Sequence, residues 1–366
     1  MKLTRLDLYQ IVIPRPRFVT AFTTYTESRN AFVRAWTDSG LCGVGETVAV
    51  PSYLGDTYEA MQGAFKILAP ALLGRDPWEI GATHDLMDDL IIGHKPSKAA
   101  IDTALHDLMG QAAGVPVYAL LGGARRHAIE THLAIPIMEP EEMAARAVQL
   151  VKDGFRSFEV KVGLEPKRDA ERIRRVREAA GPDVLLVVDT NANWTFLDAL
   201  ACLRAMEPYG IWSEQPVEHV DDLAKIRTMV KCPIIADESA KTVKDVIQVI
   251  AKAAADVVSV KLQKAGGIYP ARQIMTICDG AGLPYRIDDM GVTRIGNTAS
   301  AHLAFAAKHP VACGVAQHKN LDERVDPLRA GGVRVEGGVA RMAEGPGLGV
   351  QVDEDFFKEP VLSYSA

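Results

Sequence analysis

The sequence has few of the features that mark disulfide-rich, nucleic-acid-binding, secreted or membrane proteins. Its 366 residues include five cysteines, and no two of these have the Cys-x-x-Cys spacing of a metal site or redox motif. No block of basic residues stands out and the net charge is −6, which argues against a nucleic-acid partner. No apolar run approaches the roughly 20 residues that span a bilayer, and the first residues lack the apolar stretch of a signal peptide. We therefore expect a soluble, cytoplasmic protein with free thiols and no membrane partner.

The central part of the chain has a repeating pattern. Hydrophobic residues make up 48% of the sequence, enough for a large core and two domains. Short runs rich in Val and Ile alternate with segments of roughly 20 residues that have helical periodicity. This alternation predicts strand–helix units and a parallel sheet. Five successive runs each end on one charged residue, namely Lys161, Asp189, Glu214, Asp237 and Lys261.

The positions of these five charges predict a catalytic site. In a closed (β/α) barrel the C-terminal ends of all strands meet on one face. Asp189, Glu214 and Asp237 would then form an oxygen cage for a divalent cation, most naturally Mg²⁺, with Mn²⁺ as the alternative. Lys161 and Lys261 would flank the cage from opposite sides. Each carboxylate alone would more often be a helix cap, and Lys161 alone a surface lysine, but the ordered set of five favours the metal site.

The ordered set resembles the muconate-lactonizing-enzyme branch of the mandelate racemase/muconate lactonizing enzyme group, within the enolase superfamily. Residues 98–108 also look like that family's helix before the barrel. The resemblance implies an α/β protein built of an N-terminal α+β capping domain, a modified TIM barrel of the (β/α) type and a C-terminal segment that returns to the capping domain, at residues 1–125, 126–330 and 331–366. It also implies a homo-oligomer. Asn191 and Glu238 match positions beside the metal, although Asn191 also fits a turn.

The same patterns predict the bounds of the other elements. They include a strand at 2–13, a loop at 19–28, hairpin strands at 30–37 and 41–48, a helix at 97–113, a first barrel strand at 128–137 and an eighth at 311–317. Pro14 and Pro16 are expected to end the first strand, and Ser97 to cap the helix. His106 and Asp107, on that helix, are expected to make polar contacts between the domains rather than to act in catalysis.

Two strand ends depart from the usual patterns of the group. The second barrel strand of the branch usually ends Lys-x-Lys, whereas this chain has Glu159-Val-Lys161. Glu159 would raise the pKa of Lys161 unless it faces elsewhere or binds a cationic group of the substrate. The seventh strand ends on Asp288 and Asp289 without a histidine, which argues against the mandelate racemase branch. The aspartates either cap the next helix or form an anionic wall for an amine or quaternary ammonium group, as a similar pair suggests in family members that act on proline derivatives and betaines.

The expected chemistry is removal of the proton α to a carboxylate. The cation would stabilise the enolate, and a lysine whose pKa is lowered by that cation would be the base. Two opposed lysines suit a racemase or epimerase of an amino-acid derivative, proline- or betaine-like. A muconate-type cycloisomerase or an acid or hydroxyproline dehydratase is the alternative on this scaffold, and a catalytically silent binding barrel is a third. The resemblance places specificity in loops near 19–25 and 51–56 and at the eighth strand end, which makes Tyr53 and Gln317 candidate contacts of a small carboxylate substrate.

Overall fold

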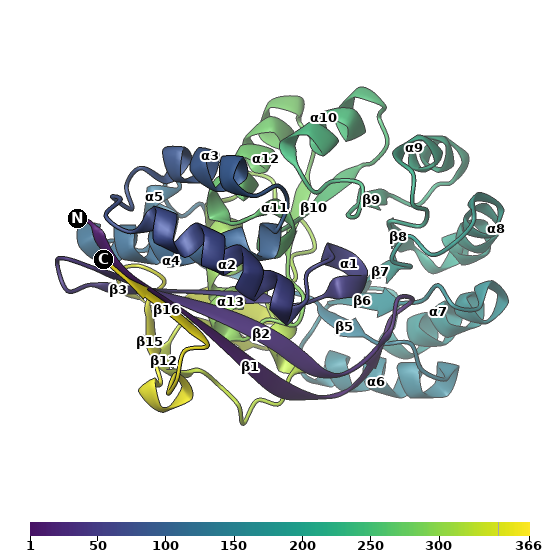
Figure 1. The fold of residues 1–366 in the computed structure, drawn as a ribbon. Helices are drawn as coiled ribbons and strands as arrows, with labels where there is room; N and C mark the ends of the chain where they lie inside the picture. Colours follow the sequence, from purple (N-terminus) through teal and green to yellow (C-terminus); the bar gives the residue numbers. More distant parts are fainter. Residues whose placement is uncertain (343) are drawn as a thin grey trace.

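A computed structural model describes residues 1–342 and 344–366. The N-terminal part is a four-stranded antiparallel sheet in the order β16-β1-β2-β3, with helices α2 and α4 packed against it (Figure 1). Its elements are β1 (Leu3–Val19), β2 (Thr24–Thr37), β3 (Cys42–Val48), α1 (Pro51–Leu54), α2 (Tyr58–Leu72), α3 (Ile80–Leu90), α4 (Lys95–Ala113), α5 (Val117–Leu120) and β16 (Leu362–Ser365). Leu6, Val33, Phe65 and Leu105 belong to the core between the sheet and the helices.

Strand β3 approaches α4 closely because two of its residues are glycines. A Cβ atom on Gly43 would lie 2.2 Å from the carbonyl oxygen of Ala104, and one on Gly45 would lie 2.0 Å from that of Ala100. Backbone atoms cannot move aside for a side chain as the end of a flexible side chain can. Any larger residue at either position would therefore push α4 away from the sheet.

Polar side chains of α4 link the capping domain to the rest of the chain. Asp102 accepts hydrogen bonds from backbone N–H groups at the start of α12, and the His106 ring contacts the Asp102 carbonyl oxygen at 2.9 Å. Asp107 accepts from the N–H groups of Val44 and Leu348, at 3.0 and 2.8 Å. Because Leu348 belongs to the C-terminal segment, α4 joins three parts of the chain. The contacts of Asp107 fit the expected polar packing between parts of the chain, whereas the polar contacts of His106 with described residues stay within α4.

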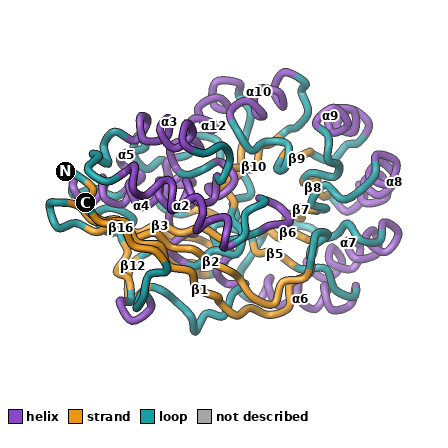
Figure 2. The backbone as a smooth tube through the Cα atoms, viewed as in Figure 1, coloured by secondary structure: helices purple, strands orange, loops and turns teal. Residues whose placement is uncertain are grey.

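The central part of the chain forms a curled sheet of seven parallel strands, in the order β11-β10-β9-β8-β7-β6-β5, with helices outside it (Figure 2). The strands are β5 (Leu133–Ile135), β6 (Ser157–Lys161), β7 (Leu185–Asp189), β8 (Ile211–Glu214), β9 (Ile234–Ala236), β10 (Val257–Lys261) and β11 (Tyr285–Asp288). The helices are α6 (Pro140–Lys152), α7 (Pro166–Ala180), α8 (Phe196–Met206), α9 (Val220–Met229), α10 (Val243–Ala251), α11 (Leu262–Ala265), α12 (Ile268–Ala281) and α13 (Arg294–Ala306). The strands are nearly all buried, as expected where a parallel sheet is covered on both faces. Among the described residues, no helix has both the length and the apolar character needed to cross a membrane.

The eighth strand, expected at 311–317, is not a regular strand. Pro310 forms an isolated bridge to β11, and Cys313 forms one to the segment just before β5. Ala312, between them, has a positive φ of 44°, which interrupts the extended conformation. A 3₁₀ helix, Gln317–Asn320, follows. The segment nevertheless bridges β11 and β5 and closes the barrel, so the barrel fold is confirmed while the bounds of this strand are wrong.

The first two strands of the capping sheet are longer than predicted. β1 runs through Pro14 and Pro16 to Val19, and β2 begins at Thr24, so most of the loop expected at 19–28 is strand. Both prolines lie beyond the part of β1 that pairs with β16, where a missing N–H leaves no ladder hydrogen bond unmade. A register shift after Pro14 accommodates the rings.

Helix α4 begins at Lys95, two residues before the predicted start. Pro96 lies in its first turn, where the missing N–H is no loss, and His94 precedes it with a positive φ of 47°. Ser97 is consequently a buried residue of the helix and not its cap.

The C-terminal segment forms two small sheets before it rejoins the capping domain. Their strands are β4 (Ile129–Glu130), β12 (Leu328–Gly331), β13 (Val333–Glu336), β14 (Val339–Met342) and β15 (Val350–Val352). β4 pairs with β14, β12 pairs with β15, and β16 pairs with β1. The strand expected at 128–137 is therefore divided, because β4 joins the hairpin β13–β14 and β5 joins the barrel.

Buried His302 makes the stability of the fold depend on pH. Its Nδ1 accepts from the Tyr118 N–H at 3.1 Å, and its Nε2 donates to the Leu348 carbonyl at 3.2 Å, so only the neutral ring fits. Burial lowers the pKa of His302 from 6.5 to about 4. Between these values the unfolded chain binds the proton and the folded chain does not, so stability is lost as the pH falls from 6.5 through 4, by about 3 kcal/mol in total.

Urea unfolding at pH 7, 5.5 and 4 measures this dependence. His302→Gln is expected to flatten the loss of stability between pH 6.5 and 4. His127→Gln, at an exposed position, is the matched control and should keep the wild-type slope. An equal slope in the wild type and in His302→Gln would contradict the assignment.

Candidate active site

The ends of the central barrel strands lie level with one another. Lys161 is paired in register with Asp189, and Asp189 with Glu214. Farther along the sheet, Lys261 at the end of β10 is paired with Asp288 of β11. All five side chains are buried. The parallel register therefore gathers these charges at one face of the barrel.

Three carboxylates at this face form a compact cluster. Oxygen atoms of Glu159, Asp189 and Glu214 all lie within 4.8 Å of one another. Oε1 of Glu214 is buried and has no hydrogen-bond partner among the described residues. Unpaired carboxylate oxygens beside like charges are costly unless a cation binds them. Because every donor is a hard oxygen, the residues present fit Mg²⁺.

Asp237, the third carboxylate that the sequence assigns to the metal, faces other partners. Nζ of Lys261 lies 2.7 Å from its Oδ2, and Nζ of Lys264 lies 2.6 Å from its Oδ1. The Tyr53 hydroxyl also donates to Oδ1 at 2.9 Å. Burial opposes ionisation of Asp237, but the two lysine charges outweigh it and hold its pKa below the usual range. Asp237 lies outside the cluster of three, and its two oxygens face Lys261 and Lys264 instead.

Both candidate catalytic lysines are buried and ion-paired. Nζ of Lys161 lies 2.5 Å from Oε1 of Glu159 and 2.5 Å from Oδ2 of Asp189. Burial alone would lower the pKa of Lys161 and of Lys261, but the carboxylates outweigh it and raise both. This direction is opposite to that expected for a base beside a cation, because the carboxylates proposed to hold the cation contact the lysines directly.

Sequence reasoning misses Lys264. This fully buried lysine in α11 donates to the carbonyl oxygens of Asp237 and Ser259, at 2.8 and 2.7 Å, as well as to the Asp237 carboxylate. Burial lowers its pKa overall. The only signal in the sequence is a second lysine three residues after Lys261, followed by Ala265 and two glycines. A lysine that is buried there must find a partner.

A buried arginine in β11 balances the acidic cluster. Arg286 is 0% exposed. Its Nη1 lies 2.7 Å from Glu214, and its Nη2 lies 2.5 Å from Glu159 and 3.0 Å from Asp288. The His132 ring lies 3.2 Å from Glu159 and 3.3 Å from Asp288. Arg286 thus supplies, from a different strand, a cation close to the position where the branch carries its first lysine.

Asn191 and Glu238 lie next to the cluster. The backbone N–H of Asn191 donates to Asp189 at 2.8 Å, and its side-chain amide donates to Asp189 at 3.1 Å and to Glu238 at 3.4 Å. Asn191 has a φ of 49°, a conformation that asparagine tolerates better than most residues. Burial, together with the charge of Asp237, raises the pKa of Glu238 to about 8, which favours its neutral form near neutral pH.

Asp289 has neutral partners. It accepts hydrogen bonds from the Asn297 amide at 2.5 Å and from the Ser300 hydroxyl at 2.8 Å, and its burial raises its pKa well above the usual value. The side chain that caps α13 is that of Thr293, which accepts from its backbone. Helix capping by Asp288 and Asp289, one of the two interpretations of the pair, is therefore excluded.

A cavity of about 780 Å³ opens between the strand ends and the capping domain. Lys161, Lys261 and Asn191 line it from the barrel, and Tyr53 and Gln317 line it from the segments that the resemblance singles out. Tyr53 comes from α1, which lies on the side of the capping domain that faces the barrel (Figure 1). Its ring centroid lies 5.4 Å from Nζ of Lys261. We call this space the mouth cavity.

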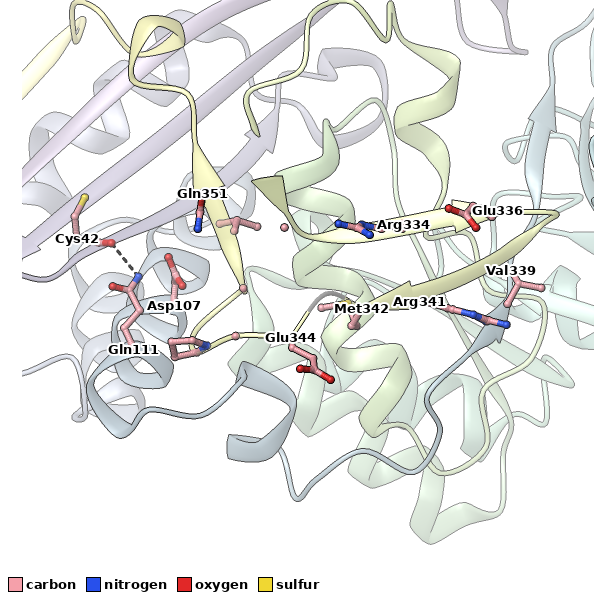
Figure 3. A pocket seen from close by; sticks show the side chains of 15 residues that line it. Cys42, Asp107, Gln111, Arg334, Glu336, Val339, Arg341, Met342, Glu344 and Gln351 are labelled. Carbon is pink, nitrogen blue, oxygen red and sulfur yellow. Dashed lines mark hydrogen bonds between the residues drawn. The ribbon is translucent and has the colours of Figure 1, made fainter. Parts of the chain in front are cut away.

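A second cavity, of about 860 Å³, lies between α4 and the returning C-terminal strands (Figure 3). Gln111 of α4 borders it and donates to the Cys42 carbonyl oxygen at 2.9 Å, and Arg334 and Arg341 lie on the hairpin β13–β14. None of the described residues that line this cavity is one of the barrel's strand-end charges. The mouth cavity is therefore the candidate active site.

Fold and site together define a capped (β/α) barrel enzyme with a buried centre of carboxylates and lysines. Residues 7–122 match the mandelate racemase/muconate lactonizing enzyme N-terminal domain, and residues 142–356 match the enolase C-terminal domain-like family. The chain belongs to the mandelate racemase/muconate lactonizing enzyme group of the enolase superfamily.

Similar proteins carry out related reactions. The chain is 35% identical to the N-succinyl-L-Arg/Lys racemase of Bacillus cereus, over 98% of each chain. It is 31% identical to the cis-3-hydroxy-L-proline dehydratase of Roseibium aggregatum, over 100% of each. The crystal structure of the dipeptide epimerase from Cytophaga hutchinsonii, complexed with Mg and the dipeptide D-Ala-L-Val, is similar with a TM-score of 0.93, at 35% identity and over 97% of each chain. Racemases and epimerases are isomerases and the dehydratase is a lyase, and this chain is an enzyme of the same group.

Proposed function

We propose that the protein is a Mg²⁺-dependent racemase or epimerase that removes the proton α to the carboxylate of an amino-acid derivative. The observation that carries the proposal is the placement of Lys161 and Lys261. Their strands, β6 and β10, are separated by three strands in the sheet, and both lysines line the mouth cavity. A substrate carbon held between them has an amine on each face, which is what inversion of its configuration requires.

The carboxylates of the strand ends would hold the metal. Asp189 and Glu214 provide hard oxygen atoms from the cluster, and Asp237 would add its own where the cation replaces Lys261 and Lys264 as its partner. Asn191 and Glu238 support these ligands from the side. When bound, Mg²⁺ supplies positive charge that stabilises the enolate form of the substrate carboxylate.

Side chains that line the mouth cavity would transfer the protons and exclude water. In the proposed reaction one of Lys161 and Lys261 is a neutral amine and accepts the α-proton, and the other is an ammonium group and donates a proton to the opposite face of the same carbon. The neutral form requires that the carboxylates in contact with that lysine are occupied by the cation instead. Tyr53, from the capping domain, covers the mouth beside Lys261 and keeps water from the reacting carbon.

The contacts of Glu159, Asp288 and Asp289 indicate whether the site can bind a substrate with a cationic nitrogen. A proline- or betaine-like substrate, expected from the sequence, would need a free carboxylate for its cationic nitrogen. Glu159 and Asp288 contact Arg286, and Asp289 is hydrogen-bonded by neutral side chains. We therefore favour a derivative whose nitrogen next to the reacting carbon is acylated and uncharged, as in an N-acyl amino acid or at the C-terminal residue of a dipeptide, in line with the names of two of the relatives.

A second candidate is a dehydratase, because the relative from Roseibium aggregatum carries that name and covers the whole chain. Its reaction would begin with the same proton removal and end with loss of a β-hydroxyl group instead of reprotonation. The products distinguish the two candidate functions. A racemase or epimerase yields the substrate with inverted configuration, whereas a dehydratase yields a keto or imino acid.

Hydrogen exchange in heavy water tests the proposed function and its metal. The α-hydrogen of N-acyl amino acids or dipeptides is expected to exchange with Mg²⁺ present and to stop exchanging in excess chelator. Glu214→Gln, which removes one charge from the cluster, is expected to slow exchange by about 100-fold or more. The rate is read from the loss of the α-proton signal in NMR spectra.

Glu178→Gln, at an exposed position of α7, is the matched control and should exchange at the wild-type rate. Full exchange in excess chelator would rule out the metal site. A complete lack of exchange across the panel would count against the proposed function itself.

A further inference from the structure

Arg15, in β1, lines the mouth cavity without a charged partner. Its guanidinium carbon lies 4.3 Å from the centroid of the Phe18 ring and 5.8 Å from that of the Tyr25 ring. Its buried Nε has no hydrogen-bond partner among the described residues. Arg29 and Arg34, on the adjacent strand β2, each pair with a glutamate. A partly buried guanidinium without such a partner loses hydration, and its contacts with the two aromatic rings offset only part of that loss.

The guanidinium group of Arg15 lies beside the loop that follows β11. A Cβ atom on Gly291, in the loop after β11, would lie 3.9 Å from Nη1 of Arg15. The Ser28 hydroxyl donates to the Gly291 carbonyl oxygen at 2.6 Å, and the Asn30 amide donates to it at 2.9 Å. These two hydrogen bonds join the capping domain to the loop after β11, beside Arg15. The guanidinium is held at the rim of the same cavity that both lysines line.

The other cations of the mouth cavity have partners. Arg29 pairs with Glu27 at 2.8 Å, and the two lysines pair with carboxylates of the barrel. Among the described lining residues, Arg15 is therefore the cation that lacks a carboxylate. Glu59, which also lines the cavity, is exposed in the first turn of α2, where the helix N-terminus stabilises its charge.

We propose that Arg15 binds a carboxylate at the end of the substrate remote from the reacting α-carbon. This proposal rests on the proposed function and narrows the substrate to amino-acid derivatives that carry two carboxylates, one at the reacting centre and one distal. A guanidinium offers a carboxylate two parallel N–H donors, and the rings of Phe18 and Tyr25 restrict its orientation. Burial lowers the pKa of Arg15 to about 10, which still leaves it charged at neutral pH.

Pairs of compounds that differ only in the distal group test the proposal. The probes are L-Ala-L-Glu against L-Ala-L-Gln, and N-succinyl-L-alanine against its terminal amide, with α-hydrogen exchange measured for the Mg²⁺-loaded full-length enzyme. The wild type is expected to prefer the acid of at least one pair by about tenfold to hundredfold in kcat/KM. Arg15→Met should remove the preference by raising KM for the acid, with kcat and the amide little changed. Arg15→Lys keeps the charge and should recover part of the preference.

Arg17→Met is the matched control, because Arg17 is exposed on the same strand and does not line the cavity. It should leave both members of each pair unchanged, and thermal melting shows whether Arg15→Met is folded. Equal exchange of acids and amides by the wild type, or an equal loss of both in Arg15→Met, would overturn the role of Arg15 and leave the racemase or epimerase proposal standing. Absence of exchange with every N-acyl and dipeptide probe would overturn both.

Discussion

Replacement of Lys161 by alanine is expected to stop net inversion of the substrate while hydrogen exchange continues from one enantiomer. Lys261→Ala should stop inversion equally and leave exchange from the other enantiomer. Each amine reaches one face of the α-carbon, so each variant loses the base for one face only. Loss of a general base lowers the rate of its step by about 100-fold to 10,000-fold. Exchange from each pure enantiomer in heavy water, with chiral chromatography of the products, measures both effects.

Lys167→Ala, at an exposed position of α7, is the control and should behave as the wild type. A cycloisomerase or dehydratase predicts a different result: one variant stops proton removal altogether and the other slows a later step. If both variants keep near-normal turnover of a substrate that the wild type inverts, the two-lysine mechanism is wrong.

Replacement of Arg286 by methionine is expected to destabilise the fold by about 3–5 kcal/mol, as removal of one partner from a buried ion pair does. Arg286 contacts Glu214, Glu159 and Asp288, and all four side chains are almost completely buried. Without the guanidinium, three carboxylates remain close together with little access to water. The free energy of unfolding from urea titration at pH 7 measures the loss.

Two further variants make the Arg286 result specific. Arg227→Met removes an arginine from a partly exposed pair with Asp256 and should cost at most about 1 kcal/mol. Glu214→Gln in the Arg286→Met background removes the carboxylate that has no other cationic partner among the described residues, and it should recover part of the stability. A loss no larger in Arg286→Met than in Arg227→Met would show that the buried arginine does not hold the acidic cluster together.

The charged residues at the strand ends could be predicted from the sequence because the local hydrophobic pattern and the topology of the barrel indicate the same positions. Each of Asp189, Glu214 and Lys261 closes a short apolar run, and parallel strands bring such ends to one face whatever the details of packing. The eighth barrel segment lacks this agreement. It has apolar residues in the right place, but Pro310 and the positive φ of Ala312 leave only isolated bridges.

The ion-pair partners of these charged residues could not be predicted from the sequence. Arg286 stands two residues before Asp288, so a period of two places both on the same side of β11. Nothing local indicates that its guanidinium reaches Glu159 and Glu214, which lie on strands far from it in the sheet order. The turn of Asp237 toward Lys264 likewise depends on how the barrel closes, since electrostatic partners are set by distances that exist only in the folded chain.

The pairing of β16 with β1 bears on the order in which the molecule can be made. β1 leaves the ribosome first of the described strands and β16 leaves last, yet they are neighbours in one sheet. The backbone groups of β1 that pair with β16 therefore have no partner strand while the whole barrel is synthesised. An open strand edge is a site where chains join wrongly. Newly made protein should accordingly be most prone to aggregate when synthesis stalls after the barrel and before β16.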